Sequence, residues 1–260
     1  MSQLTHPNTV AVYDYGRNHD GVFYYAMEYL DGIDLEHLVE RYGAQPADRV
    51  MAIVEQVSGA LNEAHGKGLT HRDIKPANII LCERGGMPDV AKVVDFGLVK
   101  ELTADTGAST EVIFGTPAYL APEVITDPAA VSPAVDLYAL GAVGYFLLTG
   151  RRVFEGRTDI EICLQHVSAT PRPPSEFARV PAALEAIILR CLAKRPDERF
   201  ASAAALVDAI RELPPLADWD DAEAHRWWRD FRASDVPPAV DAQPTMTITV
   251  DLGHRSAEIE

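Results

Sequence analysis

The sequence predicts an α+β fold whose mass is mainly helical, with a few strands near the N-terminal end. Two observations lead to this prediction. In the first third of the chain, β-branched and aromatic runs are separated by turn residues, and from Asp136 onward apolar residues recur at helical spacing. At 260 residues the chain can bury roughly 70–75% of its unfolded surface, so a sizeable core is expected.

The strands and helices can be placed in order along the chain. Residues 10–16 and 22–29 predict a β-hairpin, because the segment 17–21 between them is rich in turn residues. A second hairpin is expected from residues 79–82 and 90–94 around Gly85-Gly86. Helices are expected over 35–40 after a cap at Asp34, from Pro46 to about 64, over 137–149 before Gly150, and over 159–167, 182–192 and 202–213 with Ser202 as cap.

The segment from Pro214 to the end differs from the rest of the chain. It holds ten Asp or Glu against four Arg, a net charge of 4 − 10 = −6, and two Pro-Pro pairs that resemble linkers. Residues 219–231 predict a short amphipathic helix, and residues 246–252 alternate like a strand that either docks on an edge or stays unfolded. The Trp cluster of the helix either packs on the helical body, which we favour, or forms a partner-binding patch.

Bulk properties exclude several classes of function. The formal charge of −16 argues against nucleic acid or an anionic lipid surface as the main partner. No apolar run approaches the roughly 18–20 residues that span a bilayer, and the first seven residues do not resemble a secretory signal. Cys82, Cys163 and Cys191 lie far apart without metal-ligand spacing, which indicates reduced thiols and a cytoplasmic location.

One ordered set of polar residues indicates phosphoryl transfer. The segment 71–78 reads His-Arg-Asp-Ile-Lys-Pro-Ala-Asn, and Asp95-Phe96-Gly97 follows the second hairpin. Such chemistry needs a carboxylate to orient the attacking hydroxyl, oxygen ligands for magnesium and a cation near the transferred group. Asp73 fits the first role, Asn78 and Asp95 fit the metal, and Lys75 can reach the γ-phosphate.

With Ala121-Pro122-Glu123 further on, these motifs resemble those of the eukaryote-like (Hanks-type) Ser/Thr protein kinases of bacteria, from about His6 to about Leu213. The resemblance implies a protein-kinase-like fold: residues 1–30 would be the remnant of a truncated N-lobe sheet, 31–213 a mainly helical C-lobe, and 214–260 an acidic, partly disordered tail. It also implies ATP and Mg²⁺, with Mn²⁺ as a substitute, and protein substrates phosphorylated on Ser or Thr.

The resemblance further implies a nucleotide site. Met27 is similar to the gatekeeper, Glu28 and Leu30 belong to the segment similar to the adenine-binding hinge, Asp34 is similar to the ribose contact, and Ile80 would form the floor of the adenine pocket. Lys75, Asn78 and Asp95 would complete the contacts to the phosphates and the metal.

Other residues acquire structural or substrate roles by the same resemblance. Asp136 is similar to the buried aspartate that holds the His-Arg-Asp backbone, and Arg199 to the partner of Glu123. Thr116, in the segment Gly-Thr-Pro-Ala-Tyr, is expected near Asp73 and Lys75, where it favours Ser/Thr over Tyr as acceptor.

The position of Arg72, next to Asp73, indicates that phosphorylation regulates the kinase. A buried guanidinium beside the catalytic aspartate would need a dianionic partner, such as a phosphorylated residue of the segment between Gly97 and Gly115. Position favours Thr110, then Ser109, and a transient kinase dimer could carry out that phosphorylation. The alternative is a mobile polar loop without a regulatory role.

The chain also departs from the family pattern. No lysine occurs before Lys67, and no glycine-rich phosphate loop precedes the first hairpin, so the chain is expected to be impaired or inactive alone. A truncated kinase is favoured over a pseudokinase that serves as a binding scaffold. A small-molecule kinase is the other alternative, but it would not need the segments 115–119 and 121–123. The hairpin before Asp31 is expected to expose edges and an apolar face, and therefore to be aggregation-prone or partly disordered.

Overall fold

The computed structural model describes residues 4–17, 23–96, 116–127, 131–214, 216 and 218–234. The described helices are α1 (Leu35–Tyr42), α2 (Ala47–Gly66), α4 (Pro122–Thr126), α5 (Ala134–Thr149), α6 (Asp159–Ser168), α7 (Ala182–Cys191), α8 (Ala203–Arg211) and α9 (Asp221–Ala233). The strands are β1 (Val12–Arg17), β2 (Phe23–Met27), β3 (Gly32–Asp34), β4 (Ile79–Arg84) and β5 (Met87–Val93). Short 3-10 turns are η1 (Pro76–Asn78), η2 (Pro117–Tyr119), η3 (Pro174–Glu176) and η4 (Pro196–Glu198).

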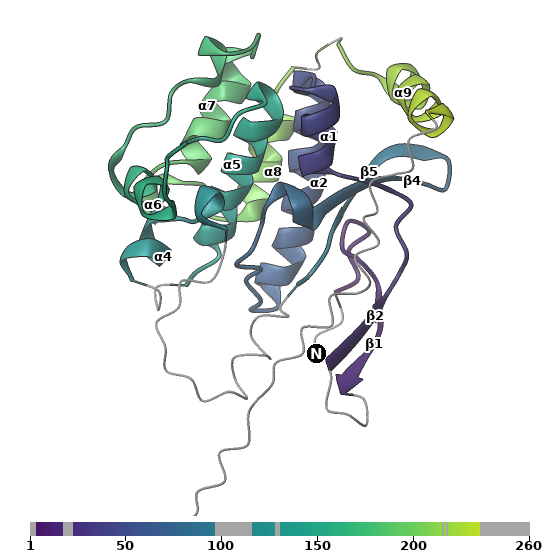
Figure 1. The fold of residues 1–260 in the computed structure, drawn as a ribbon, viewed down its shortest axis with the longest axis horizontal. Coiled ribbons are helices and arrows are strands. Elements are labelled where there is room, and N and C mark those ends of the chain that lie inside the picture. Colours follow the sequence, from purple (N-terminus) through teal and green to yellow (C-terminus); the bar gives the residue numbers. More distant parts are fainter. Residues whose placement is uncertain are drawn as a thin grey trace, which may run out of the picture.

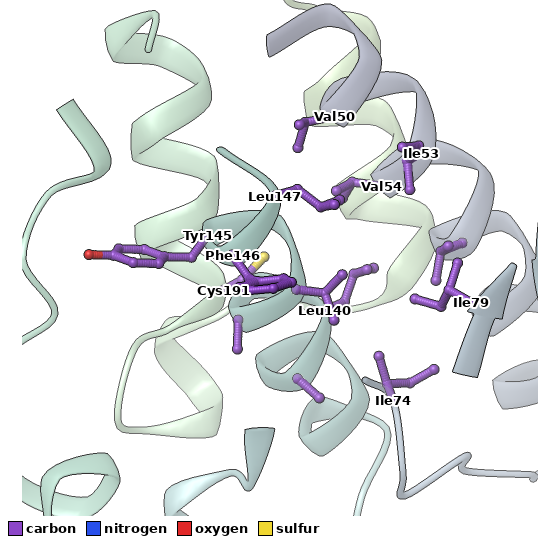
Figure 2. Close-up of a cluster of buried hydrophobic side chains, with 14 of the residues drawn as sticks. Val50, Ile53, Val54, Ile74, Ile79, Leu140, Tyr145, Phe146, Leu147 and Cys191 are labelled. Atoms are coloured by element: carbon purple, nitrogen blue, oxygen red, sulfur yellow. The ribbon is translucent and has the colours of Figure 1, made fainter. Parts of the chain in front are cut away.

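Helix α5 is the centre of the core. It is apolar on all sides and almost entirely buried, and α2 and α7 pack against it while α8 packs on α2. Figure 2 shows Leu140, Phe146 and Leu147 of α5 among side chains of α2 and β4. Two glycines allow the close approach of α7: a Cβ on Gly141 would lie 2.5 Å from Cys191 Cβ, and one on Gly144 would lie 2.6 Å from Ile188 Cδ1.

The strands form two sheets (Figure 1). Antiparallel β3, β4 and β5 make a three-stranded sheet, in which Gly85 and Gly86 supply the positive φ angles of the β4–β5 turn. Strands β1 and β2 make a separate antiparallel pair. The segment before β1 joins the larger sheet, because Val93 N donates to Asn8 O at 2.8 Å and Val10 N donates to Val93 O at 3.0 Å.

The segment after α8 folds back onto the body. Helix α9 packs on β5, and Figure 1 shows it beside the β4–β5 hairpin. Trp228 is only 1% exposed and donates from Nε1 to Asp89 Oδ1 at 2.9 Å. Arg49, also 1% exposed, pairs with Asp89 at 2.7 Å and lies between the rings of Trp219 and Trp227. The structure therefore shows the packed alternative for the Trp cluster.

The predicted α+β fold is confirmed, and so are both hairpins and the expected helices. Asp34 caps α1, and Ser202 caps α8 by accepting from Ala205 N at 3.1 Å. Strand β3 and helix α4 were not expected from the sequence. The domain boundaries stay predictions, and the strand-like pattern at 246–252 lies outside the described residues. Among the helices described, none has the length and apolar character needed to cross a bilayer.

Candidate active site

Asp136, at the start of α5, fixes the backbone of the loop that carries Asp73. The side chain is 1% exposed, and its two oxygens accept from His71 N and Arg72 N, each at 2.8 Å. His65 Nε2, at the end of α2, lies 2.8 Å from Asp136 Oδ2. Arg72 takes a left-handed backbone with φ of 69°, which a non-glycine residue adopts at a cost, and the two peptide hydrogen bonds offset that cost.

His71 joins this loop to the segment that carries Asp95. Its ring is buried; Nε2 lies 2.9 Å from Val94 O, and Asp73 N donates to Nδ1 at 3.3 Å. Because Val94 O can only accept and Asp73 N can only donate, the network assigns the proton to Nε2. The edge of Phe96 contacts the same ring, with the centroids 4.6 Å apart. His71 is thus a buried structural residue that sets the spacing between residues 73 and 95.

Asp73, Lys75 and Asn78 meet around one oxygen atom. Lys75 Nζ lies 2.7 Å from Asp73 Oδ2, and Asn78 Nδ2 donates to the same oxygen at 2.9 Å. Asn78 Nδ2 also donates to the Asp73 carbonyl at 2.8 Å. The turn η1 makes this possible, because it brings Asn78 back toward the residue five positions before it. Among the described residues none donates a hydrogen bond to the other oxygen of Asp73, which leaves that oxygen available to an incoming hydroxyl.

Asp95 follows β5 and is joined to Asn78 through the backbone. Val94 N donates to Asn78 O at 3.0 Å, and Asp95 itself has φ of 63°. Burial raises the pKa of the Asp95 carboxyl, and the negative charge of Asp73 adds to the shift, while His71 and Lys75 oppose it. A carboxylate that is costly to ionise in the free protein is stabilised by a cation beside it.

These residues fit a divalent cation. Since Asn78 uses Nδ2 toward Asp73, its Oδ1 is left as a free acceptor, and in the part of the chain described no hydrogen bond reaches that atom or the Asp95 carboxylate. Hard oxygens of this kind suit Mg²⁺, which keeps waters and phosphate oxygens in its shell. No cluster of three or more His, Cys, Asp or Glu among the described residues could hold a metal alone, so phosphates and water would complete the shell.

The residues expected to contact the nucleoside lie at the junction of the two sheets. Met27 ends β2 and is 41% exposed, and Leu30 is half-buried in the link to β3. Ile80 in β4 pairs with Asp34 in β3, so the two residues are neighbours across the strands. Asp34 is already engaged: Oδ1 accepts from Glu36 N and His37 N, each at 3.0 Å, and Oδ2 lies 2.5 Å from His37 Nδ1.

Glu28 forms ion pairs that the sequence did not indicate. It is 3% exposed and lies 2.8 Å from Lys92 Nζ of β5, with Arg84 of β4 as a second cation. Its side chain also accepts from Ala11 N at 2.9 Å, and Lys92 Nζ reaches Thr9 O at 3.3 Å. One carboxylate thereby ties the link between β2 and β3 to the strands that lead to Asp95.

The structure describes only some of the residues that were expected to act in regulation or in binding the acceptor. Thr116 precedes η2, and within the described residues no hydrogen bond links its side chain to Asp73 or Lys75. Thr110, Ser109 and Gly97 lie outside the described residues. The expectation of a buried Arg72 guanidinium is wrong, because the side chain is exposed. Asp136 holds its peptide N–H and the backbone is left-handed, so the side chain leaves the buried loop toward solvent.

Glu123 of α4 and Arg199 form an ion pair in which the arginine is buried. The Arg199 side chain is fully buried and lies 2.7 Å from both carboxylate oxygens of Glu123. It also donates to the carbonyls of Ala134 and Ala193, at 2.8 and 2.9 Å. The pair therefore joins α4 to the start of α5 and the end of α7.

The chain belongs to the protein kinase family: the model of the protein kinase domain matches residues 1–209. This confirms the family that the sequence motifs indicated. Similar proteins include the Ser/Thr kinase pkn3 of Myxococcus xanthus, 41% identical over 211 residues, and PknB of Mycolicibacterium smegmatis, 40% identical over 216 residues. The kinase PrkC of Bacillus subtilis is 37% identical over 203 residues.

The alignments cover 78%, 80% and 78% of this chain but only 38%, 34% and 30% of those three relatives. The chain thus spans about a third of their length. Among solved structures, the PknI kinase domain of Mycobacterium tuberculosis superposes with a TM-score of 0.63 at 34% identity, covering 81% of this chain and 74% of that one. The Rad53 kinase domain with AMPPNP gives 0.67 at 28% identity, covering 85% and 80%.

Proposed function

We propose that the protein that carries this chain is a Ser/Thr protein kinase, which transfers the ATP γ-phosphate to hydroxyls of protein substrates with Mg²⁺ as the preferred metal and Mn²⁺ as a substitute. The observation that carries the proposal is the meeting of Lys75 and Asn78 on one oxygen of Asp73, with Asp95 joined to Asn78 through the backbone. Family membership and the Ser/Thr kinase names of the relatives support it.

The side chains would divide the work as follows. Asp73 accepts the proton of the attacking hydroxyl and orients it, with Lys75 and Asn78 fixing one of its oxygens so that the other faces the substrate. Lys75 places a positive charge near the transferred group. Asn78 Oδ1 and Asp95 would hold the metal, which when bound neutralises charge on the phosphate oxygens. Asp136 and His71 position this set without touching the substrate.

The remaining roles in the proposal concern the nucleoside and the acceptor. Met27, the backbone of Glu28 and Leu30, and Ile80 would surround the adenine, while Asp34 would contact the ribose. Thr116 would favour Ser and Thr acceptors, and phosphorylation of Thr110 or Ser109 in a transient dimer would engage Arg72. The free thiols Cys82, Cys163 and Cys191 support a cytoplasmic location.

A binding scaffold without transfer is the second candidate. In that case the chain would bind nucleotide or a partner without accelerating the chemistry.

Two measurements separate the candidates. Calorimetry of ATP binding to the chain, with and without Mg²⁺, tests the site itself, and we expect Mg²⁺ to strengthen binding in wild type but not in Asp95→Asn. Transfer of labelled phosphate to a generic basic protein is then measured with the full-length protein. Binding that depends on Mg²⁺ without any transfer would favour the scaffold, and absence of both would contradict the proposed site.

A further inference from the structure

A cavity lies in the helical body, lined by parts of α5, α6, the loop between them and the segment after α6. Its volume is about 260 Å³, and its lining includes Arg151, Arg152 and Arg172 together with the rings of Tyr145, Phe154 and Phe177. Figure 2 shows Tyr145 extending from α5 away from Val50 and Ile53, on the opposite side of the helix from α2.

The charge of this cavity is opposite to that of the chain as a whole. The chain has a formal charge of −16, yet three guanidinium groups converge here, with Glu155 as the single carboxylate of the lining. Glu176 neutralises Arg172 at 2.5 Å. Arg151 has no carboxylate partner within the described residues, and its guanidinium lies over the Phe177 ring, 5.1 Å from the centroid. Arg152 has only a long contact to a carboxylate, at 3.8 Å from Glu36 Oε1, so Arg151 and Arg152 are the two guanidinium groups that can bind an incoming carboxylate.

The cavity is held in shape before any ligand arrives. Thr149 Oγ1 accepts from Arg151 N at 3.1 Å and donates to Tyr145 O at 2.8 Å, which ties the backbone after α5 to the last turn of the helix. The Arg172 guanidinium lies over the Phe177 ring, 4.5 Å from its centroid. Buried Phe154 packs edge-on against His166, with the centroids 5.0 Å apart. A site fixed in this way orders few groups when it binds, which favours affinity.

Arg152 extends from the cavity toward α1 and toward η2, the turn that follows Thr116. Arg152 NH2 lies 3.8 Å from Glu36 Oε1 of α1. Burial raises the pKa of the Tyr119 hydroxyl in η2, and the charge of Arg152 opposes that shift, so Arg152 is close to this turn. The Tyr119 hydroxyl is buried and has no hydrogen-bond partner among the described residues. Helix α6 also packs on η2.

We propose that this cavity, the arginine pocket, binds an acidic side chain of the protein substrate, on a stretch of peptide next to the Ser or Thr that accepts phosphate. The proposal rests on the proposed function and adds a substrate class to it: acceptor sites flanked by Asp or Glu. Arg151 and Arg152 supply the charge, and Phe154 and Phe177 supply the apolar walls that peptide-binding sites combine with arginine.

Size and charge select this ligand over others. Pockets for drug-sized molecules typically measure about 300–1,000 Å³, so a cavity of about 260 Å³ suits one or two peptide side chains better than a nucleotide. The net charge of the chain disfavours long polyanions such as nucleic acid, whereas one or two carboxylates on a peptide meet only the local positive charge.

Peptide binding measured by fluorescence anisotropy tests the proposal without requiring transfer. The probes are Ser-containing peptides with Asp and Glu on one or the other side of the Ser, matched peptides with Asn and Gln, and a phosphoserine version. The chain is compared with Arg151→Ala and Arg151→Ala/Arg152→Ala. Arg195→Ala is the matched control, because Arg195 is exposed, pairs with Asp197 on η4 and lies outside the cavity lining. Thermal melts verify that each variant is folded.

We expect the acidic peptides to bind about tenfold or more tightly than the neutral ones, and the double substitution to remove that preference, since it removes charge-assisted hydrogen bonds. Arg195→Ala should retain the preference. Equal binding of acidic and neutral peptides, or equal loss in the Arg195→Ala control, would overturn the proposal. Binding of the phosphopeptide alone would also overturn it, in favour of a phosphate-specific site.

The outcome can be told apart from a failure of the proposed function. If the acidic preference is present but the full-length protein never phosphorylates any of the peptides, the pocket stands and the kinase proposal fails. If phosphorylation occurs with no preference for acidic flanks, the kinase proposal stands and the pocket fails.

Discussion

Asp136 Oδ1 accepts a hydrogen bond from the peptide nitrogen of Arg72 at 2.8 Å, and Arg72 has a φ of 69°. A buried carboxylate on one helix thus holds an unfavourable backbone conformation on a loop 64 residues earlier. The position of Asp73 depends on this contact, because the peptide N–H groups of the two preceding residues, His71 and Arg72, are both bound to Asp136.

Asp136→Asn should lower both stability and activity. The amide offers one acceptor oxygen where three donors now converge, so at least one buried N–H is left without a partner, at a cost of about 1–3 kcal/mol. Urea unfolding measures the loss. Asp197→Asn, an exposed carboxylate on η4, is the matched control and should change stability by less than about 0.5 kcal/mol. Equal effects of the two substitutions would contradict the assigned role of Asp136.

Asp95→Asn should stabilise the free chain while it weakens metal binding. Because burial raises the folded-state pKa of Asp95, the stability that its proton contributes is present at low pH and is lost as pH rises through that pKa. At neutral pH the ionised group is therefore destabilising, and an amide removes that penalty. Asn also tolerates the left-handed backbone. Chemical unfolding at pH 7 should show the gain, and a clear loss of stability would contradict it.

Metal affinity should depend on pH for the same reason. Protons compete with the cation for Asp95, so the affinity for Mn²⁺ in the presence of ATP should fall as pH is lowered through the raised pKa of this carboxyl. Electron paramagnetic resonance of free Mn²⁺ gives the titration. The dependence should flatten in Asp95→Asn, and an unchanged pH profile in that variant would show that another group binds the metal.

Glu28→Gln should destabilise the link between β2 and β3. The Lys92 side chain is 8% exposed, and removing its partner leaves a buried charge without compensation, which typically costs about 3–5 kcal/mol. Adding Lys92→Met removes that charge, so the double variant should be more stable than the sum of the two single effects predicts. Exact additivity in urea unfolding would contradict a direct Glu28–Lys92 interaction. The exposed pair Glu223–Arg226 gives the control cycle.

Trp228→Ala should cost about 3–5 kcal/mol, because the indole is buried and its N–H satisfies Asp89. Trp228→Phe retains most of the volume and loses the hydrogen bond, so its cost should be smaller. Hydrogen exchange should quicken in α2 and β5, which carry Arg49 and Asp89. Arg229→Ala, an exposed site on the same helix, is the control. Unchanged exchange in Trp228→Ala would show that α9 is not an integral part of the helical body.

The sequence predicted most elements because their signals are local. Helix α5 is a long apolar stretch closed by Gly150, and the β4–β5 turn is marked by two consecutive glycines. Strand β3 is three residues long and was missed, since its pairing with β4 comes from tertiary packing. The spacing of the motifs, together with the groups that phosphoryl transfer needs, predicted that Asp73, Lys75, Asn78 and Asp95 belong to one site.

Contacts between distant side chains could not be predicted in this way. Arg49 and Asp89 are 40 residues apart, and neither has a local pattern that indicates a buried ion pair. Glu28 appeared only as part of a hinge-like segment, and its pairing with Lys92 depends on how β5 meets the preceding link. The arginine pocket arises from residues between 145 and 177, which surround a cavity only once α5 and α6 are packed.

The most direct test of the account is the rate of γ-phosphate transfer to a Ser- or Thr-containing protein, measured with the full-length protein and with its Asp73→Asn and Asp95→Asn variants. If four side chains meet around the terminal phosphate and its metal, each substitution should lower the rate by about 10²-fold or more, with Asp197→Asn unchanged. Variants that transfer phosphate as fast as wild type would contradict the assignment of the active site.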